Sequence, residues 1–227
     1  MCIRDRFRID VARELVAEVA TAAIPPETPV AMRVFGHREP KSCRTDLEIP
    51  LGPLDAEAFA ATVAAIEPQK LSRTPLADSL RAVATDLAEV TGRRTILLLT
   101  DGQETCGGDP AEAVAELAAK GIDVQVNVVG LALKSKWKSA FEDLAAQTDG
   151  RYLDAPDAAS LRAALEEALT LQYVVYDERG RPAGSGAVGG QPLSLMPGTY
   201  TVTVSLAQPK TFTVTIPDGK DVVLEVK

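Results

Sequence analysis

Apolar residues recur along the first 170 residues with two periods, which predict alternating helices and strands. Spacings of three or four residues indicate helical faces, and short continuous apolar runs indicate buried strands. Helices are expected around Val11–Val19, Asp55–Ile66, Leu76–Val90, Asp109–Pro110 and the residues after it, Trp137–Leu144 and Leu161–Leu169. Strands are expected at Val30–Phe35, Asp46–Leu51, Thr95–Thr100, Val124–Val129 and Arg151–Leu153.

Several residues mark where these elements begin and end. Pro25 and Pro26 stop the first helix, Gly92 closes the long one, and Asp157 is the expected N-cap of the last helix. The resulting order is α-β-β-α-α-β-α-β-α-β-α. Strands that alternate with helices predict an α/β fold, a three-layer α/β/α domain with a mostly parallel sheet.

The pattern changes after Leu171, so we place a domain boundary near residue 170. Strand patterns follow at Tyr173–Tyr176, Thr199–Leu206, Thr211–Ile216 and Val222–Val226, and Gly184–Gly190 is interpreted as a flexible turn. Residues 171–227 are therefore expected to form a small β-sandwich-like accessory domain with few contacts to residues 1–170. Its fold resembles carboxypeptidase-regulatory or immunoglobulin-like accessory domains.

Composition excludes several classes of function. The chain has 227 residues, of which 46% are hydrophobic and 25% charged, as in globular proteins. The net charge is −8 and no basic patch is visible, so no nucleic-acid partner is expected. No apolar run approaches the roughly 18 residues of a membrane span, and Met1–Arg8 lacks the apolar core of a signal peptide.

The reactive side chains are few. The three cysteines are Cys2, Cys43 and Cys106, with no C-x-x-C pair, and His37 is the single histidine. A Cys/His zinc site and a Ser/His/Asp triad are therefore not expected. Cys2 is the thiol expected to be left over. His37 follows a predicted strand, and we interpret it as structural or solvated rather than as a ligand-contacting residue.

Two oxygen-bearing residues stand where a metal ion could bind. Asp101 follows the most apolar strand and precedes Gly102, and Thr74 precedes the long helix. Ligands bind beyond the carboxyl ends of strands in open parallel sheets, and hydroxyl and carboxylate oxygens suit Mg²⁺, Mn²⁺ or Ca²⁺. Taken alone, Thr74 is more readily interpreted as a helix N-cap and Asp101 as part of an ordinary turn.

Together these residues resemble two motifs of the von Willebrand factor A (VWA) family. Thr74-Pro75-Leu76 and Thr100-Asp101-Gly102 resemble the second and third motifs of its metal-ion-dependent adhesion site. The surrounding sequence, roughly residues 8 to 170, resembles a bacterial extracytoplasmic subgroup of VWA domains. The resemblance includes Phe35-Gly36-His37, Cys43 and Glu104-Thr105-Cys106. The resemblance implies a VWA fold in which Thr74 and Asp101 contribute to a Mg²⁺, Mn²⁺ or Ca²⁺ site.

One family motif is absent. VWA domains open with an apolar strand that ends in D-x-S-x-S and supplies most metal ligands, and this sequence has neither. In the family that strand lies between those expected at Val30 and Thr95. We therefore expect a fragment of a longer protein that lacks its central strand. It should bind Mg²⁺ weakly or not at all by itself and should expose two unpaired strand edges.

Cys43 and Cys106 are expected to form a disulfide, because each follows a strand end on the proposed ligand-binding side. The alternative is two buried free thiols. A disulfide would imply an oxidising compartment, namely a bacterial periplasm or cell surface.

The expected function is protein binding, in which the cation bridges to an acidic residue of a partner protein. A scaffold with a vestigial metal site is one alternative. A metal-dependent hydrolase is the other, although no general base or substrate pocket can be named. Asp10, Asp46 and Glu104 are possible accessory carboxylates, each interpreted first as a solvated charge or a local cap.

Overall fold

The computed structural model describes residues 3–25, 28–188, 191–204 and 210–225, and the chain divides into two compact units. The first unit comprises Met1–Leu169 and the second Thr170–Lys227. Cys2 lies outside the described residues. No helix within the described residues is both long and apolar enough to cross a lipid bilayer.

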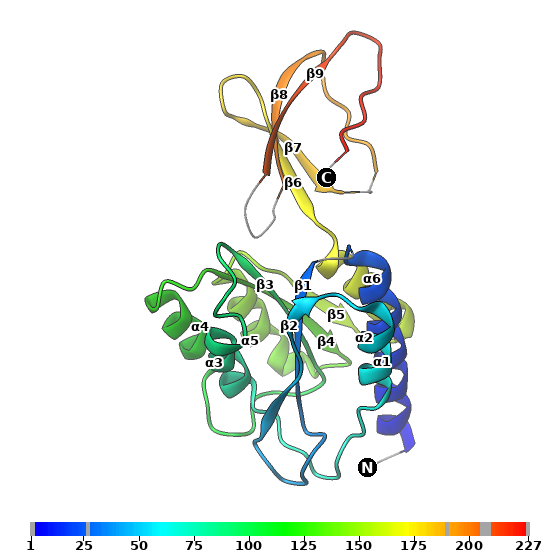
Figure 1. Ribbon diagram of the computed structural model, residues 1–227, viewed down its shortest axis with the longest axis vertical. Helices are drawn as coiled ribbons and strands as arrows, with labels where there is room; N and C mark the ends of the chain where they lie inside the picture. The colour runs from blue at the N-terminus through cyan, green and yellow to red at the C-terminus, as the bar shows by residue number, and fades with distance from the viewer. Residues whose placement is uncertain (1–2, 26–27, 189–190, 205–209, 226–227) are drawn as a thin grey trace. The chain divides into compact units, whose positions relative to one another are not determined.

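The first unit is an α/β domain whose elements follow the expected order (Figure 1). Its elements are α1 (Ile3–Ala23), β1 (Pro29–Phe35), β2 (Thr45–Pro53), α2 (Ala56–Ala64), α3 (Leu76–Asp86), β3 (Arg94–Thr100), α4 (Pro110–Ala119), β4 (Val124–Leu131), α5 (Ser135–Ala146), β5 (Tyr152–Ala155) and α6 (Ala158–Leu169). The predicted α/β class is confirmed.

The core forms on both faces of a parallel sheet with the order β3-β4-β5. Val126 and Val128 of β4 point to one face, where they pack with α3, α4 and α5. Val129 points to the opposite face, where it packs with α1 and α6. Because successive side chains of a strand alternate between faces, a strand covered on both sides is apolar throughout. Figure 1 shows the two groups of helices on either side of the strands.

The hairpin of β1 and β2 forms a separate antiparallel pair. In the part of the chain that the structure describes, β1 pairs only with β2 and β3 pairs only with β4. The hairpin is instead attached to the domain by side chains. Phe35 packs against the core cluster of α3, α4 and α5, and Met32 and Ile49 pack against Phe59 and Val63 of α2.

Helix α3 ends earlier than its apolar spacing predicts. The expected helix continued to Val90, whereas α3 ends at Asp86 and Leu87 is its C-cap. Arg94 of β3 donates hydrogen bonds to the carbonyls of Leu87, Val90 and Gly92. These bonds satisfy carbonyl groups beyond the end of α3, so the chain can leave the helix before its apolar spacing stops.

The second unit is a four-stranded antiparallel sheet with the order β7-β6-β8-β9. The strands are β6 (Gln172–Tyr176), β7 (Pro182–Ala187), β8 (Gly198–Val204) and β9 (Lys210–Ile216). The all-β class is confirmed, and the described residues form one sheet without a second sheet facing it.

Two local expectations for the second unit were wrong. The turn expected at Gly184–Gly190 is a strand as far as Ala187, because β7 pairs with β6, and residues 189–190 lie outside the described residues. Residues 222–225 are not a strand, and Val226 lies outside the described part. Glycine gives no apolar alternation, so pairing with β6 makes a strand that the sequence pattern does not reveal.

Candidate functional site

Asp101 lies at the carboxyl end of β3, in a turn held by the residue before it. The hydroxyl of Thr100 accepts a hydrogen bond from the Gly102 N–H at 3.3 Å and donates one to the Gly102 carbonyl at 2.9 Å. Thr100 is buried, whereas Asp101 is exposed to solvent. The turn therefore fixes the backbone on both sides of an accessible carboxylate.

Thr74 lies beside this turn. Its hydroxyl oxygen is 3.7 Å from the point that a Cβ atom on Gly102 would occupy. The Thr74 N–H donates to the Thr105 hydroxyl at 2.7 Å, and the Thr105 N–H donates to the Thr74 carbonyl at 3.1 Å. These bonds join the segment before α3 to the loop after β3. The structure thus brings Thr74 next to the turn that carries Asp101.

Glu104 fastens the same two segments together. One carboxylate oxygen accepts the N–H of Ala77 at 2.9 Å, and the other accepts the N–H of Cys106 at 2.5 Å. Pro75 is the N-cap of α3 and makes no side-chain capping bond, so Glu104 caps this helix from a distant loop. Thr74 is therefore not the N-cap of α3, although its position in the sequence allowed that role. Glu104 caps α3 through the N–H of Ala77, which lies 27 residues before it in the sequence.

The predicted disulfide is confirmed. Cys43, in the loop between β1 and β2, bonds to Cys106, and their Cα atoms lie 5.8 Å apart. Since Cys106 follows Glu104 closely, the bond ties the end of the hairpin to the loop that carries Asp101. The loops after β1 and after β3 are therefore covalently joined.

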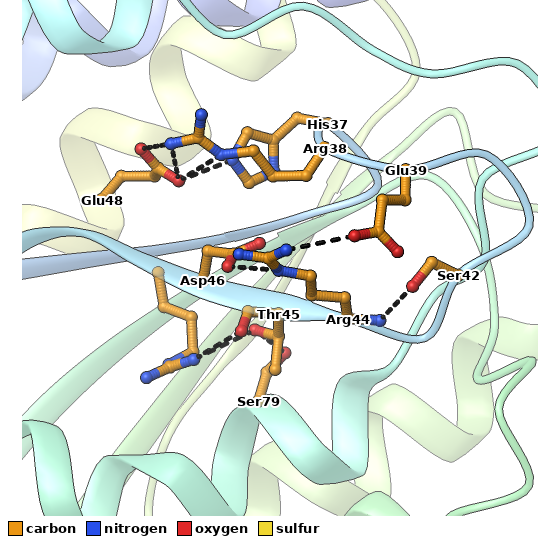
Figure 2. Close-up of polar contacts among 10 residues, drawn as sticks. His37, Arg38, Glu39, Ser42, Arg44, Thr45, Asp46, Glu48 and Ser79 are labelled. Carbon is orange, nitrogen blue, oxygen red and sulfur yellow. Dashed lines mark hydrogen bonds and ion pairs between the residues drawn. The ribbon is translucent and has the colours of Figure 1, made fainter.

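A second polar cluster lies at the same end of the hairpin (Figure 2). The Nε2 atom of His37 lies 2.7 Å from Oε1 of Glu48, and Arg38 donates to both oxygens of that carboxylate at 2.7 and 2.6 Å. Arg44 donates to Oδ1 of Asp46 at 2.6 Å. Hydrogen bonds from Arg38 and His37 hold the pKa of the Glu48 carboxyl below its usual value of 4.5.

The geometry of β2 explains this cluster. Asp46 and Glu48 are two residues apart on β2, at a register shift in its pairing with β1. His37 comes from the loop after β1, and potential ligand atoms of the three side chains lie within 4.8 Å of one another. The side chains of His37 and Asp46 are only 7% and 17% exposed. Asp46 is thus neither a solvated charge nor a local cap. Sequence reasoning missed Glu48, although its spacing from Asp46 was a usable signal.

Asp10, the third possible accessory carboxylate, belongs neither to the Thr74–Asp101 site nor to the cluster around His37. Asp10 lies on the exposed side of α1, where it forms an ion pair with Arg13 one helical turn away. Spacing of three residues places two side chains on the same helical face, so this contact needs no ligand to explain it. Asp10 is a surface charge, as its first interpretation held.

Both groups have donors that suit metal ions. Thr74 and Asp101 supply a hydroxyl and a carboxylate, which are hard oxygen donors of the kind that Mg²⁺ and Mn²⁺ take. These donors fit such an ion in kind, but two protein ligands are few for an octahedral ion. His37, Asp46 and Glu48 each offer one potential ligand atom within 4.8 Å of the others.

The fold and these motifs agree with a known family. The sequence profile of the von Willebrand factor type A domain matches residues 6–167. This match covers well over half of the chain, and the protein belongs to the VWA family. The VWA family membership that was expected from the motifs around Thr74 and Asp101 is therefore confirmed.

Similar proteins span several organisms. The uncharacterized protein YwmD of Bacillus subtilis is 30% identical over 170 residues, which cover 70% of this chain and 75% of YwmD. An aerotolerance-related membrane protein from Bacteroides fragilis has a similar fold, with a TM-score of 0.53, 18% identity and coverage of 71% of this chain and 87% of its own. Proximal thread matrix protein 1 from the mussel byssus, solved with a zinc-occupied MIDAS motif, has a TM-score of 0.53, 18% identity and coverage of 75% and 45%.

Proposed function

We propose that the first unit is a metal-ion-dependent protein-binding module. Thr74 and Asp101 contribute ligands to a divalent cation, with Mg²⁺ as the favoured ion and Mn²⁺ or Ca²⁺ as substitutes. A carboxylate of a partner protein completes the coordination. The observation that carries the proposal is the position of the Thr74 hydroxyl against the Asp101–Gly102 turn, at the carboxyl end of β3. Ligand sites of open parallel sheets lie at this end.

The surrounding bonds support a preorganised site. Thr105 and Glu104 hold the two loops together through backbone N–H groups, and Thr100 fixes the turn itself. Ligands that are already fixed lose less entropy on binding an ion. The cation supplies one strong and directional contact to a partner carboxylate, and no bond is broken.

Binding is favoured over catalysis by the exposure of Asp101. Its carboxylate lies on the surface of the turn after β3, where an acidic side chain of a partner protein can reach a cation bound to it. A hydrolase needs a substrate pocket at its metal ion, whereas a binding module needs an accessible surface.

The disulfide supports a location outside the cytoplasm, in a bacterial periplasm or at a cell surface. Structural disulfides persist in oxidising compartments and are rare in the cytosol. The similar protein from Bacteroides fragilis is described as a membrane protein, in agreement with this location.

Paramagnetic broadening by Mn²⁺ tests the metal site, because it detects weak binding. Mn²⁺ added to the isotope-labelled full chain should broaden the backbone signals of Gly102 and Thr74 before those of the rest of the molecule. Asp101→Ala should abolish this selective broadening. Thr74→Val should weaken it, because only the hydroxyl donor is lost.

A matched acidic residue provides the control. Asp149 is exposed and lies in another loop, so Asp149→Asn should leave broadening at Gly102 unchanged. Selective broadening that survives Asp101→Ala would exclude the proposed site. Mg²⁺ should compete with Mn²⁺ for it, and acidic peptides should bind to the full chain only when the cation is present.

A further inference from the structure

We propose that His37, Asp46 and Glu48 form a second metal site, which binds a divalent transition metal ion such as Zn²⁺. This site is distinct from Thr74 and Asp101 and does not depend on their function. It lies on one face of the β1–β2 hairpin end, where Figure 2 shows the three side chains among their arginine partners.

Two buried polar atoms without partners point to a ligand. Nδ1 of His37 and Oδ2 of Asp46 are both inaccessible to solvent, and neither has a hydrogen-bond partner among the described residues. The His37 side chain is more than nine-tenths buried. A buried polar atom left unpaired destabilises the folded state, so such atoms are rare in folded proteins. A cation held by Oδ2 of Asp46 would use one of these lone pairs. To donate a ring nitrogen to the same ion together with Glu48, the His37 imidazole must turn out of its present contact with that carboxylate.

The donor set suits a transition metal better than Mg²⁺. Imidazole nitrogen is a good ligand for Zn²⁺, and two carboxylates complete a three-residue set of nitrogen and oxygen atoms. Zinc holds such ligands at about 2.0–2.2 Å, which places ligand atoms roughly 3–4 Å apart. The three potential ligand atoms here lie within 4.8 Å of one another, so the most distant pair must move closer when zinc binds.

The backbone around His37 is already held in place. The side-chain amide of Gln69 donates to the His37 carbonyl at 3.2 Å, and the Gln69 N–H donates to the Gly36 carbonyl at 2.9 Å. The disulfide of Cys43 anchors the same loop, and Asp46 and Glu48 lie on a paired strand. Ligands on fixed backbone bind a metal with less loss of entropy.

Two arginines act as competing cations. Arg38 neutralises Glu48 and Arg44 neutralises Asp46, while both guanidinium groups remain half exposed. An incoming Zn²⁺ replaces Arg38 as the positive partner of Glu48, and Arg38 can move into solvent. The Arg38→Ala chain is therefore expected to bind zinc more tightly than the wild type, because the competitor is gone.

Because His37 is the only histidine, its imidazole gives a single set of NMR signals in the untagged full chain. Addition of Zn²⁺ alone should shift these signals with one-to-one stoichiometry. Calorimetry on the Asp101→Ala chain, in which the first site is removed, should give the same stoichiometry. An imidazole spectrum unchanged by Zn²⁺ would overturn the proposal without any variant.

Variants then assign the ligands. His37→Gln removes the imidazole nitrogen and Asp46→Asn removes the carboxylate charge, so each is expected to weaken zinc binding by at least about tenfold. Arg38→Ala should strengthen it, and Asp101→Ala should leave it unchanged. Circular dichroism melting shows whether each variant is folded. Binding that survives His37→Gln, or is lost in Asp101→Ala, would refute this site and assign zinc elsewhere.

Discussion

Arg33 of β1 and Asp86 of α3 form a two-point ion pair, with both nitrogen–oxygen distances at 2.6 Å. The side chains are only 19% and 8% exposed. Arg33 also donates to the Thr45 carbonyl of β2 at 3.0 Å, so one guanidinium joins both strands of the hairpin to the last residue of α3. The hairpin has no strand pairing to β3 in the described residues, which makes this contact a main polar attachment.

Replacement of Asp86 by Ala should destabilise the first unit by roughly 3 kcal/mol, because it leaves a mostly buried guanidinium without its carboxylate. Urea unfolding followed by the fluorescence of Trp137, the only tryptophan, measures this loss. Glu167→Ala removes a half-exposed partner of Arg151 and should cost less than about 1 kcal/mol. Equal losses in the two variants would show that the hairpin does not depend on Arg33 and Asp86.

Loss of the disulfide should also destabilise the first unit. The bond joins residues 63 positions apart. In the chain-entropy view its removal costs roughly 4 kcal/mol. Cys43→Ala/Cys106→Ala should lower the urea midpoint, and reducing agent should then have no further effect on it. A wild-type midpoint that dithiothreitol leaves unchanged, with the thiols shown by mass spectrometry to be reduced, would contradict this expectation.

Gly150 lies too close to β4 for any side chain. A Cβ atom there would be 2.0 Å from the carbonyl oxygen of Val126, and backbone atoms cannot rotate away. Gly150→Ala should therefore cost roughly 2–3 kcal/mol through displacement of β4. Gly52→Ala is the control, because its nearest neighbour would be 4.0 Å away. Tm values from differential scanning calorimetry should fall only for Gly150→Ala.

Asp157 should give the first unit an acid-sensitive cap. Hydrogen bonds from the Ser160 hydroxyl at 2.6 Å and its N–H at 2.9 Å hold the pKa of Asp157 below its usual 3.8. Because the pKa of Asp157 is lower in the folded state, the stabilisation by its carboxylate is complete at pH values above the unfolded-state pKa. This stabilisation is lost as the pH falls through the folded-state pKa. Asp157→Ala should therefore be less stable than the wild type at neutral pH, and the difference should vanish in strong acid.

Urea midpoints measured between about pH 2 and pH 6 test this dependence. Asp157→Asn keeps a capping oxygen without a titrating group, so its deficit should be smaller and should vary less with pH. A constant difference between Asp157→Ala and the wild type across this range would show that the carboxylate charge plays no part.

The sequence by itself determined the order of elements in the first unit and which segments are apolar. Apolar period and strand length are local properties, and a run such as Thr95–Thr100 is stable only where helices cover both of its faces. The N-caps of α4 and α6 could also be predicted, because Asp109 and Asp157 accept hydrogen bonds from N–H groups within three residues of each. The position of Asp101 at a strand end and of Thr74 before a helix also followed from the local pattern.

Only the tertiary structure decided the contacts between distant segments. Glu104 caps α3, and Arg94 donates a hydrogen bond to a carbonyl beyond the end of that helix. His37 lies beside Asp46 and Glu48. No local sequence pattern predicts any of these contacts. Pairing with β6 likewise made a strand of the glycine-rich residues in β7. Polar side chains satisfy their hydrogen bonds with whatever the folded chain brings near, so their roles depend on topology rather than on sequence spacing.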